Sequence, residues 1–502
     1  MFKNLQKYLL IKHPLLWNLK IVPLAMVTFA FHIMFFIIGY TNGVIDFTET
    51  EDNYYLHSDD SVVVFFSVLI SLLTAIIWIV FYFKNNAYKS FYPKKKFSLF
   101  IEWTMLLLGG LLLSSYMLTF FYAKDVKARS YFSKKEAMKR CETLAIGSFF
   151  IDGSYDFNEY ITVDSASVTK NVPLDTFNYR GRKYHVNSLV NKNIREFDFT
   201  SHKQDSLLKV RIKDWLVHDQ KDSVRMALQD YLKIAKEHHR QGNITAEEWT
   251  DLVYDYPNFM RYKKIGIEER TYFNQNEYDY EEVRTQIDTA NEYLKTIGKD
   301  QFKYNKHYVP AAELNYGYKR IAKSWVNPTV NSEMALVFIY IALAFSIVIF
   351  SFRVTSGKHW LIALISYGVL NMLVGMVSAF FDTEKLYLVF STFIAFAIII
   401  YFFTVVALHK GKSISGVTLN VLLWILPVFL PITYYSVIEI SKRLCGYYDE
   451  TIDYVYRSRL FPTITMLDDS YKLIFQINAA FIVIAMLYLS IVIKKWKGIA
   501  ES

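Results

Sequence analysis

The stretch MALVFIYIALAFSIVIFSF, residues 334–352, contains no charged side chain. A helix rises about 1.5 Å per residue, so about 20 apolar residues cross the roughly 30 Å of bilayer hydrocarbon. Other stretches of the 502-residue chain have the same character. The eight predicted spans cover about 20–40, 61–83, 98–122, 334–352, 360–380, 386–408, 418–440 and 472–493. The sequence therefore predicts an all-α polytopic membrane protein with eight transmembrane helices.

The composition agrees with a membrane protein. Hydrophobic residues make up 53% of the chain and charged residues 21%, whereas a typical soluble protein has about 25% charged residues. The counts of 18 glycines, 10 prolines and 2 cysteines exclude collagen-like, disordered and disulfide-scaffold chains. No small-residue cleavage site follows the first apolar run, so we expect a retained helix there and not a signal peptide.

A polar segment divides the predicted spans into a group of three and a group of five. Apolar residues recur at helical spacing over about 204–235, while alternating patterns at 159–163 and 182–186 indicate short strands. The segment is thus predicted to be a mainly helical α+β domain. The expected organisation is an interfacial N-terminal helix with spans one to three over 1–122, the soluble domain over 123–333, and spans four to eight over 334–502.

Local signals in the polar segment support this reading. Ser133 and Thr245 each precede a glutamate by three residues, which is the spacing of a capping box at the start of a helix. The Arg180-Gly181 step, directly before the second alternating pattern, indicates a hairpin turn.

Loop charge predicts the orientation in the membrane. Segments 1–13, 84–97, 353–359, 409–416 and 494–502 together hold 15 Lys and Arg and one acid. The loop at 41–60, on the opposite side, holds six acids and no base. Because Lys and Arg accumulate in cytoplasmic loops, we expect both termini in the cytoplasm and residues 123–333 outside it. The expected location is the bacterial cytoplasmic (inner) membrane.

The basic balance of the chain does not indicate nucleic-acid binding. The formal net charge is +9, yet residues 124–333 carry 34 Lys and Arg against 31 Asp and Glu. The excess therefore lies in the short loops, where it fixes topology and contacts anionic lipid headgroups. We expect the lipid bilayer, and no nucleic acid, to be the partner of these charges.

Catalytic and nucleotide-binding motifs are missing from the sequence. Gly411-Lys412-Ser413 resembles the end of a phosphate-binding loop, but Val406 stands where that loop needs a glycine. Glu237-His238-His239 lacks the i,i+4 histidine pair of a zinc hydrolase and is expected to be a solvated helix end. We expect no catalytic residues, no cofactor and no metal, and hence a protein that is not an enzyme.

Ionisable groups are scarce in the predicted spans. His32 is the only one deep in a span, while Glu102 and Glu439 stand near span ends, where they are expected to reach the interface. Ion-driven transporters usually carry intramembrane carboxylates or basic groups, so this scarcity argues against an ion-driven mechanism. His32 has two interpretations, a ligand or proton site and a packed histidine bonded to a neighbouring helix, of which we favour the second.

Two further features of the spans stand out. Gly368, Asn371 and Gly375 share one face of the fifth span, which favours helix packing through small residues and leaves a substrate path as the alternative. Pro427 and Pro431 interrupt the hydrogen-bond ladder of the seventh span, which predicts a kink.

Both cysteines are expected on the outer side of the membrane. Cys141 begins the soluble domain, and Cys445 directly follows the seventh span. A non-cytoplasmic compartment permits a disulfide between them. Two free thiols are the favoured alternative, because a disulfide needs Cα atoms within about 7 Å.

The N-terminal layout contains two elements that suggest a partner. Residues 5–13, before Pro14, are predicted to form a short amphipathic helix in the cytoplasmic interface, and Lys94, Lys95 and Lys96 form a compact basic loop after span two. An interfacial helix followed by such a loop over the first 120 or so residues is similar to the exporter-type permeases of ATP-binding-cassette transporters. The resemblance implies that both elements dock a separate ATPase subunit. The chain departs from the usual permease in its eight spans and large outer domain.

The function that these observations favour is a permease-like subunit of a multi-component transporter, energised by a separate ATPase. The absence of a nucleotide motif and the small number of intramembrane charges both support it. The alternative is a non-transporting scaffold or sensor whose outer domain binds an envelope protein or a ligand. A membrane enzyme ranks third.

Overall fold

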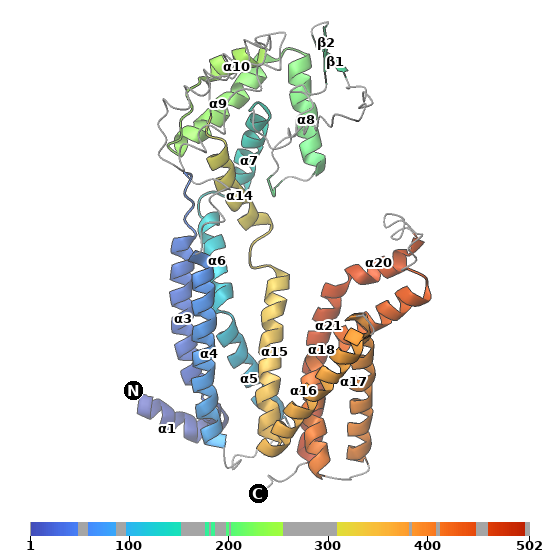
Figure 1. The fold of residues 1–502 in the computed structure, drawn as a ribbon. Helices are drawn as coiled ribbons and strands as arrows, with labels where there is room; N and C mark the ends of the chain where they lie inside the picture. The colour runs from blue at the N-terminus through green and yellow to red at the C-terminus, as the bar shows by residue number, and fades with distance from the viewer. Residues whose placement is uncertain are drawn as a thin grey trace. The chain divides into compact units, whose positions relative to one another are not determined.

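The computed structural model describes residues 2–48, 59–86, 97–151, 176–179, 182–185, 197–199, 202–254, 309–380, 384–407, 412–447 and 460–496. These residues are almost entirely helical (Figure 1). The chain forms two compact units, each described by itself. The membrane unit consists of Met1–Phe36, Val62–Phe120 and Val330–Ser502, and the second unit of Ile37–Ser61 and Phe121–Thr329.

Seven helices in the described part of the chain are long and apolar enough to cross a membrane. They match seven of the predicted spans, so the multi-pass helical architecture is confirmed. These helices are α3 (Ile21–Asn42), α4 (Asp59–Asn86), α15 (Ser332–Val354), α16 (Gly357–Phe380), α17 (Glu384–Ala407), α18 (Lys412–Leu444) and α21 (Tyr471–Trp496).

The predicted third span is a bent pair of helices. α5 (Ser98–Ser114) and α6 (Tyr116–Arg129) meet at an angle of 53°, and the number of spans is eight if they cross the membrane together. The end of α5 leaves backbone carbonyls without helical partners, which is costly in a bilayer. Ser71 of α4 donates through Oγ to the Leu113 carbonyl at 2.7 Å. Ser115 donates through Oγ at 2.6 Å to the Leu111 carbonyl, which also accepts the Ser115 amide at 3.2 Å. A hydroxyl donor from α4 thus bonds a carbonyl at the bend.

Two adjacent glycines of α5 make room for the Trp78 ring of α4 and for the backbone of α15. A Cβ atom on Gly109 would lie 2.6 Å from the Trp78 ring of α4, and one on Gly110 would lie 3.2 Å from the Ala342 carbonyl oxygen of α15. A side chain at Gly109 would clash with the Trp78 ring, and one at Gly110 would lie in tight contact with α15. The glycines lie in the main core of the membrane unit, whose fully buried side chains include Trp103, Leu106 and Phe350.

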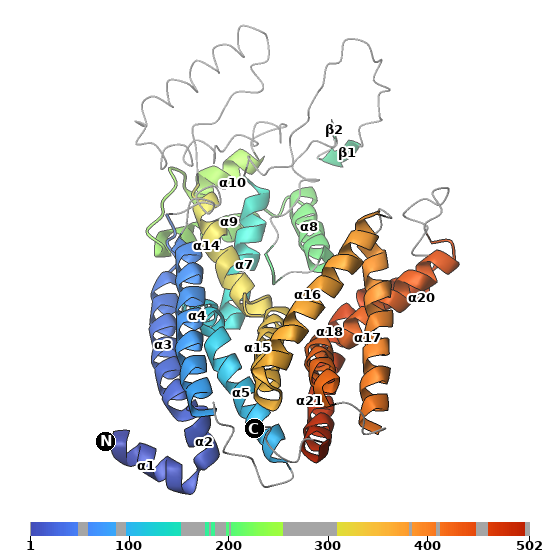
Figure 2. The same cartoon turned by 60° about the horizontal axis from the view of Figure 1, so that its bottom comes forward.

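The N-terminal helix expected over 5–13 is present as α1 (Phe2–Lys12). Pro14 occupies the first turn of α2 (Pro14–Leu19), a position where a proline has no amide bond to lose. Lys20 then adopts a left-handed conformation, φ 52°, which ends α2 before α3 begins at Ile21. Figure 2 shows α1 lying across the end of α3 rather than along it. We call α1, α2 and Lys20 the elbow.

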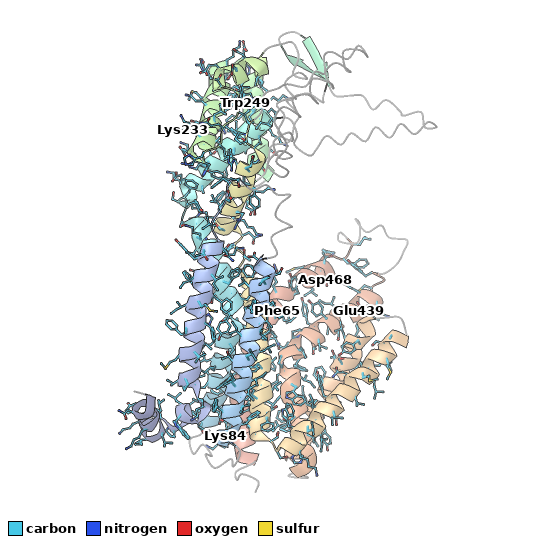
Figure 3. All side chains as sticks on the ribbon, turned by 60° about the vertical axis from the view of Figure 1, so that its left-hand side comes forward. Phe65, Lys84, Lys233, Trp249, Glu439 and Asp468 are labelled. Atoms are coloured by element: carbon cyan, nitrogen blue, oxygen red, sulfur yellow. The ribbon has the colours of Figure 1, made fainter. Side chains whose placement is uncertain are left out.

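The second unit is a helical assembly with its own core. Its described helices are α7 (Lys134–Phe149), α8 (His202–Val217), α9 (Lys221–Glu237), α10 (Ala246–Tyr254) and α14 (Ala312–Val326). Tyr231 of α9 and Trp249 of α10 are fully buried against each other with ring centroids 5.5 Å apart, and Figure 3 labels Trp249. The Tyr231 ring covers Gly147 of α7, where no side chain would fit.

Both predicted capping positions begin helices. Ser133 accepts the Glu136 amide at 3.3 Å at the start of α7. At the start of α10, the Thr245 hydroxyl accepts the Glu248 amide at 3.2 Å and the Glu248 carboxylate accepts the Thr245 amide at 2.9 Å, which completes a capping box.

The only strands in the described residues form one short hairpin. β1 (Thr176–Tyr179) pairs antiparallel with β2 (Arg182–His185), and Tyr179 faces Arg182. The strand predicted over 182–186 is thus present in shorter form, while 159–163 and Arg180-Gly181 lie outside the described residues. Two strands of four residues do not make an α+β domain. That part of the predicted fold class is not supported, because amphipathic helices supply the core.

The chain that follows α3 belongs to the second unit and not to a free loop. The Ile45 amide donates to the Tyr131 hydroxyl at 3.0 Å, and Arg240 Nε donates to the Phe47 carbonyl at 3.0 Å. The Phe47 ring fills the space beside Gly317, where no side chain would fit. This packing explains why the second unit begins at Ile37, whereas the sequence suggested a start at residue 123.

Candidate functional site

A buried ion pair joins α5 to α15 inside the membrane unit. Arg353 Nε lies 3.1 Å from Glu102 Oε1, and the two side chains are 5% and 1% exposed. Tyr82 of α4 donates its hydroxyl to the same carboxylate oxygen at 3.0 Å. Three helices therefore meet at one carboxylate. We expected Glu102 to reach the interface and Arg353 to be a loop charge, but both side chains turn inward, where each neutralises the other.

The geometry of this pair indicates a functional element. Removing two charges from water costs several kcal/mol per ion, and the attraction between them offsets this cost only when every polar atom is satisfied. Here Glu102 Oε2 is buried and has no hydrogen-bond partner among the described residues. An apolar contact of the same size would stabilise the helices equally well. Buried charges in membrane helices generally mark sites of function.

The elbow is bonded to the same part of α4. Trp78 Nε1 donates to the carbonyl of Leu19, the last residue of α2, at 2.8 Å, and Leu19 is fully buried. Trp78 and Tyr82 are one helical turn apart and so lie on the same face of α4. Leu19, Trp78, Tyr82, Glu102 and Arg353 thus form a continuous connection from the elbow to α15. We call these five residues the junction cluster.

The junction cluster lies towards the Lys84 end of α4, which is labelled in Figure 3. There α15 is also bonded to α18. Thr355 and the buried Asn420 exchange hydrogen bonds of 3.0 and 3.2 Å, and Trp424 Nε1 donates to Ser351 Oγ at 2.9 Å. The end of α15 is therefore fixed to helices on both sides.

At the other end of the membrane unit, Glu439 of α18 also fails to extend outward as expected. Its side chain is 7% exposed and accepts from Arg443 Nε at 3.0 Å. Nearby, Lys442 Nζ lies 2.7 Å from a carboxylate oxygen of Asp468 in α20 (Pro462–Asp469). Figure 3 labels both acids. Arg443 and Asp468 are nearly half exposed, so these pairs are weaker constraints than the Glu102–Arg353 pair.

His32 lies at the bend between α5 and α6. Its Nδ1 is 2.6 Å from the Thr119 hydroxyl, and its Nε2 is 3.1 Å from the Leu112 carbonyl oxygen. Because a carbonyl only accepts, Nε2 carries a proton. The Tyr116 ring contacts the imidazole edge to face, with centroids 4.9 Å apart. Both ring nitrogens are engaged by neighbouring helices, which is the geometry of the packed histidine that the sequence favoured.

Asn371 bonds to a neighbouring helix, but the glycines beside it do not pack. Asn371 Oδ1 accepts the Tyr387 hydroxyl of α17 at 2.8 Å. No described atom outside the local helix backbone lies within 4 Å of a Cβ atom built on Gly368 or Gly375. A cavity of about 50 Å³ adjoins Asn371, far smaller than the pockets that hold small-molecule ligands. Helix packing through these two glycines is not observed among the described residues.

The prolines of α18 are compensated by a side chain from α21. Pro431 has no amide, so the carbonyl of Pro427, four residues earlier, loses its helical partner. Asn478 Nδ2 donates to that carbonyl at 2.7 Å and to the Tyr340 hydroxyl at 2.9 Å. Asn478 thus supplies the donor that Pro431 lacks, and α18 continues through both prolines.

The remaining residues that the sequence singled out are three loop lysines and the two cysteines. Lys94, Lys95 and Lys96 lie outside the described residues. Cys141 and Cys445 are free thiols in the structure, the first buried and the second exposed. Cys141 Sγ lies 4.0 Å from the Tyr318 carbonyl oxygen, and burial raises the pKa of its thiol far above the usual range.

His238 in the second unit is not the solvated histidine that its sequence context suggested. Its ring stacks on Phe47 with centroids 3.7 Å apart, and its Nε2 is 2.9 Å from the Tyr318 hydroxyl. Burial, together with the adjacent Arg140 guanidinium, lowers the pKa of His238 to about 4. Arg140 also pairs with Glu237 at 2.6 Å. The described residues contain no group of three or more His, Cys, Asp or Glu that would hold a metal.

Comparisons with family models, with curated proteins and with solved structures found no match. The described helices themselves define the class, a multi-pass helical membrane protein. Sequence reasoning missed Trp78, Tyr82 and Arg353 as site residues. The available signal was weak: an arginine and a glutamate, each within one or two turns of a span end, in spans that otherwise contain almost no charge.

Proposed function

We propose that the chain is a permease-like subunit of a multi-component transporter in the bacterial cytoplasmic membrane, energised by a separate ATPase. The observation that carries the proposal is the junction cluster. It bonds the elbow and the Lys84 end of α4 to α5 and α15 through two hydrogen bonds and one buried ion pair. A partner that moves the elbow, or the loop after α4, would thereby move α5 and α15.

Loop charge supports the orientation that this proposal needs. The segments 1–13, 84–97 and 353–359 are close in the sequence to members of the junction cluster, and they carry ten of the Lys and Arg expected on the cytoplasmic side, with no acid. In this orientation both termini and the junction cluster are cytoplasmic, and residues 123–333 are extracytoplasmic. An ATPase in the cytoplasm then meets the elbow and Lys94–Lys96 directly.

The charges of the membrane unit support a mechanical role more than ion transport. Glu102 and Arg353 neutralise each other, and Glu102 Oε1 accepts hydrogen bonds from both Arg353 and Tyr82. Ion-driven transporters usually carry intramembrane ionisable groups as relays, whereas these two side chains are engaged with each other. The energy for transport then enters from outside the chain.

The alternative proposal is a scaffold or sensor that transports nothing. The observation in its favour is the second unit, which has its own buried core. In this proposal, that unit binds an envelope protein or a ligand. The two proposals differ in the cytoplasmic partner. Only the permease-like subunit requires an ATPase.

The docking role is tested by replacing Lys94, Lys95 and Lys96 together with Gln. We expect the ATPase to be lost from the purified complex while protein abundance is unchanged. A matched control replaces three exposed lysines of α7, Lys134, Lys135 and Lys139, and should retain the ATPase. Retention of the ATPase by the loop variant would reject docking at this loop.

Topology has to be verified in the same cells, because loop lysines also set orientation. Single cysteines at positions 53 and 88, in an otherwise cysteine-free chain, should show opposite accessibility to an impermeant thiol reagent in intact cells. Labelling at both positions would contradict the proposed orientation.

A further inference from the structure

A groove runs between α3 and α4 in the membrane unit. Its volume is about 450 Å³, within the range of ligand sites. Leu24, Val27 and Phe31 of α3 form one wall, while Leu73, Ile77 and Trp78 of α4 form much of the other. Figures 1 and 2 both show these two helices side by side. Apart from Lys20 and Thr74, the residues that line the groove are apolar.

The groove opens to the hydrocarbon of the bilayer. Val27 is 46% exposed, Leu73 52% and Ile77 58%, and all three belong to helices of membrane-spanning length. An apolar surface of this kind faces lipid tails in a membrane protein. The occupant that the groove accepts is therefore a flexible apolar chain that enters from the bilayer.

Lys20 gives one end of the groove a positive charge. It lies directly before α3, a helix of membrane-spanning length, and its Nζ is 3.7 Å from the centroid of the Trp17 ring. Tryptophan and lysine are both common at the ends of membrane spans, where the chain meets the interface. The ammonium at this end complements an anionic headgroup and not a second cation.

The length of the groove matches one leaflet. Along α3 it extends from Lys20 to Phe31, which is about 16 Å at about 1.5 Å per residue. Half of the roughly 30 Å hydrocarbon core is about 15 Å. One acyl chain whose phosphate lies at Lys20 thus fills the groove without crossing the bilayer midplane.

We propose that this groove is a binding site for an anionic phospholipid, with the phosphate at Lys20 and one acyl chain between α3 and α4. The acyl chain would contact the Trp78 ring, whose indole nitrogen donates a hydrogen bond to the Leu19 carbonyl. The lipid thereby touches the junction cluster at the elbow. This inference does not depend on the proposed transport function, since it concerns lipid bound to the resting protein.

The test uses the full-length protein, purified in detergent and supplied with equimolar phosphatidylglycerol and phosphatidylcholine. Native mass spectrometry counts the lipids that remain bound. We expect a preference for phosphatidylglycerol of about fivefold, the ratio that one basic residue near an anionic surface confers. The Lys20→Gln variant should bind both lipids equally. The control Lys358→Gln changes an exposed lysine at the start of α16 and should retain the preference.

The acyl-chain site is tested separately by filling the groove. Ile77→Trp and Val27→Trp each place an indole in it from opposite walls, and each should remove the bound phosphatidylglycerol. Ile365→Trp, on a lipid-facing surface of α16 that is 60% exposed, should leave it bound. Both groove positions are exposed, so folding is preserved and is verified by the elution volume. Unchanged phosphatidylglycerol binding in both groove variants, or an unchanged preference in Lys20→Gln, would refute the site.

Discussion

Arg353 of α15 and Glu102 of α5 form a buried ion pair with 3.1 Å between Nε and Oε1, although 251 residues separate them in the chain. The pair links the group of helices before the second unit to the group after it. Tyr82 adds α4 to the same contact, and Trp78 on α4 adds the elbow. The Lys84 end of the membrane unit is thus held by a few polar contacts in an otherwise apolar core.

Breaking this pair on one side should destabilise the membrane unit strongly. Glu102→Gln leaves the Arg353 charge buried without its counter-ion, which costs about 3–5 kcal/mol. Replacing both residues by Leu removes both charges and should restore most of that loss. Equilibrium unfolding in mixed micelles measures the difference.

The exposed pair between Glu333 and Lys472 provides the matched comparison, since both side chains are about half exposed. Glu333→Gln should cost less than about 1 kcal/mol. Equal losses in Glu102→Gln and Glu333→Gln would show that burial of the first pair has no energetic consequence.

Asn478 should contribute more to stability while position 431 is proline than when it is not. In the wild-type chain, Asn478→Leu removes the donor to the Pro427 carbonyl, at a cost of about 1 kcal/mol that is typical of hydrogen bonds between membrane helices. In Pro431→Ala the restored amide binds that carbonyl itself, so the same Asn478→Leu change should cost less. A double-mutant cycle measures this coupling, and strictly additive effects would disprove the compensation.

The stability of the second unit should fall as the pH falls from about 6.5 to about 4. The pKa of His238 is near 4 in the folded protein, mainly because of burial, and about 6.5 when exposed. The unfolded chain therefore binds a proton in this window that the folded chain excludes, and stability is lost on acidification. The surrounding charged and titratable groups are Arg140, Glu237, His239 and Tyr318.

Thermal unfolding of the full chain at pH 7.5 and pH 5 measures this effect. The pH-dependent loss should be smaller in His238→Gln, which cannot be protonated. The exposed His218, replaced by Gln, serves as the control and should behave like the wild type. An identical pH dependence in His238→Gln would show that another group is responsible.

Only one of the two cysteines should react in the folded protein. Cys445 is exposed, whereas Cys141 is buried and its raised pKa keeps it in the unreactive thiol form. Maleimide labelling followed by mass analysis should add one group, and none in Cys445→Ser. Denaturant should expose the second thiol. If neither thiol reacts until a reductant is added, the two are joined by a disulfide, contrary to the structure.

The positions of the spans could be predicted from the sequence, because a run of about 20 apolar residues that crosses a bilayer has to form a helix. The break at Ser115 did not, since the apolar run over 98–122 continues through it and the compensating donor, Ser71, lies on another helix. The Glu102–Arg353 pair was missed for a similar reason. Each residue stands near a span end, where a charge can reach either water or a partner, and only tertiary packing decides between the two.

The second unit shows the same limit. Capping residues such as Ser133 act within one helical turn, so their role was predictable. The burial of Phe47 beside Gly317 and His238 depends on contacts between distant segments, which periodicity does not report. That contact lies within the second unit, whose first segment is Ile37–Ser61.

The central claim, that a separate ATPase energises this membrane subunit from the cytoplasmic side, is tested most directly by mild extraction of the tagged full-length protein after crosslinking in cells. Mass spectrometry of the purified complex should identify a subunit with a nucleotide-binding motif, crosslinked to α1 or to the loop at 87–96. A complex that contains no ATPase under these conditions would contradict the permease proposal and favour the scaffold.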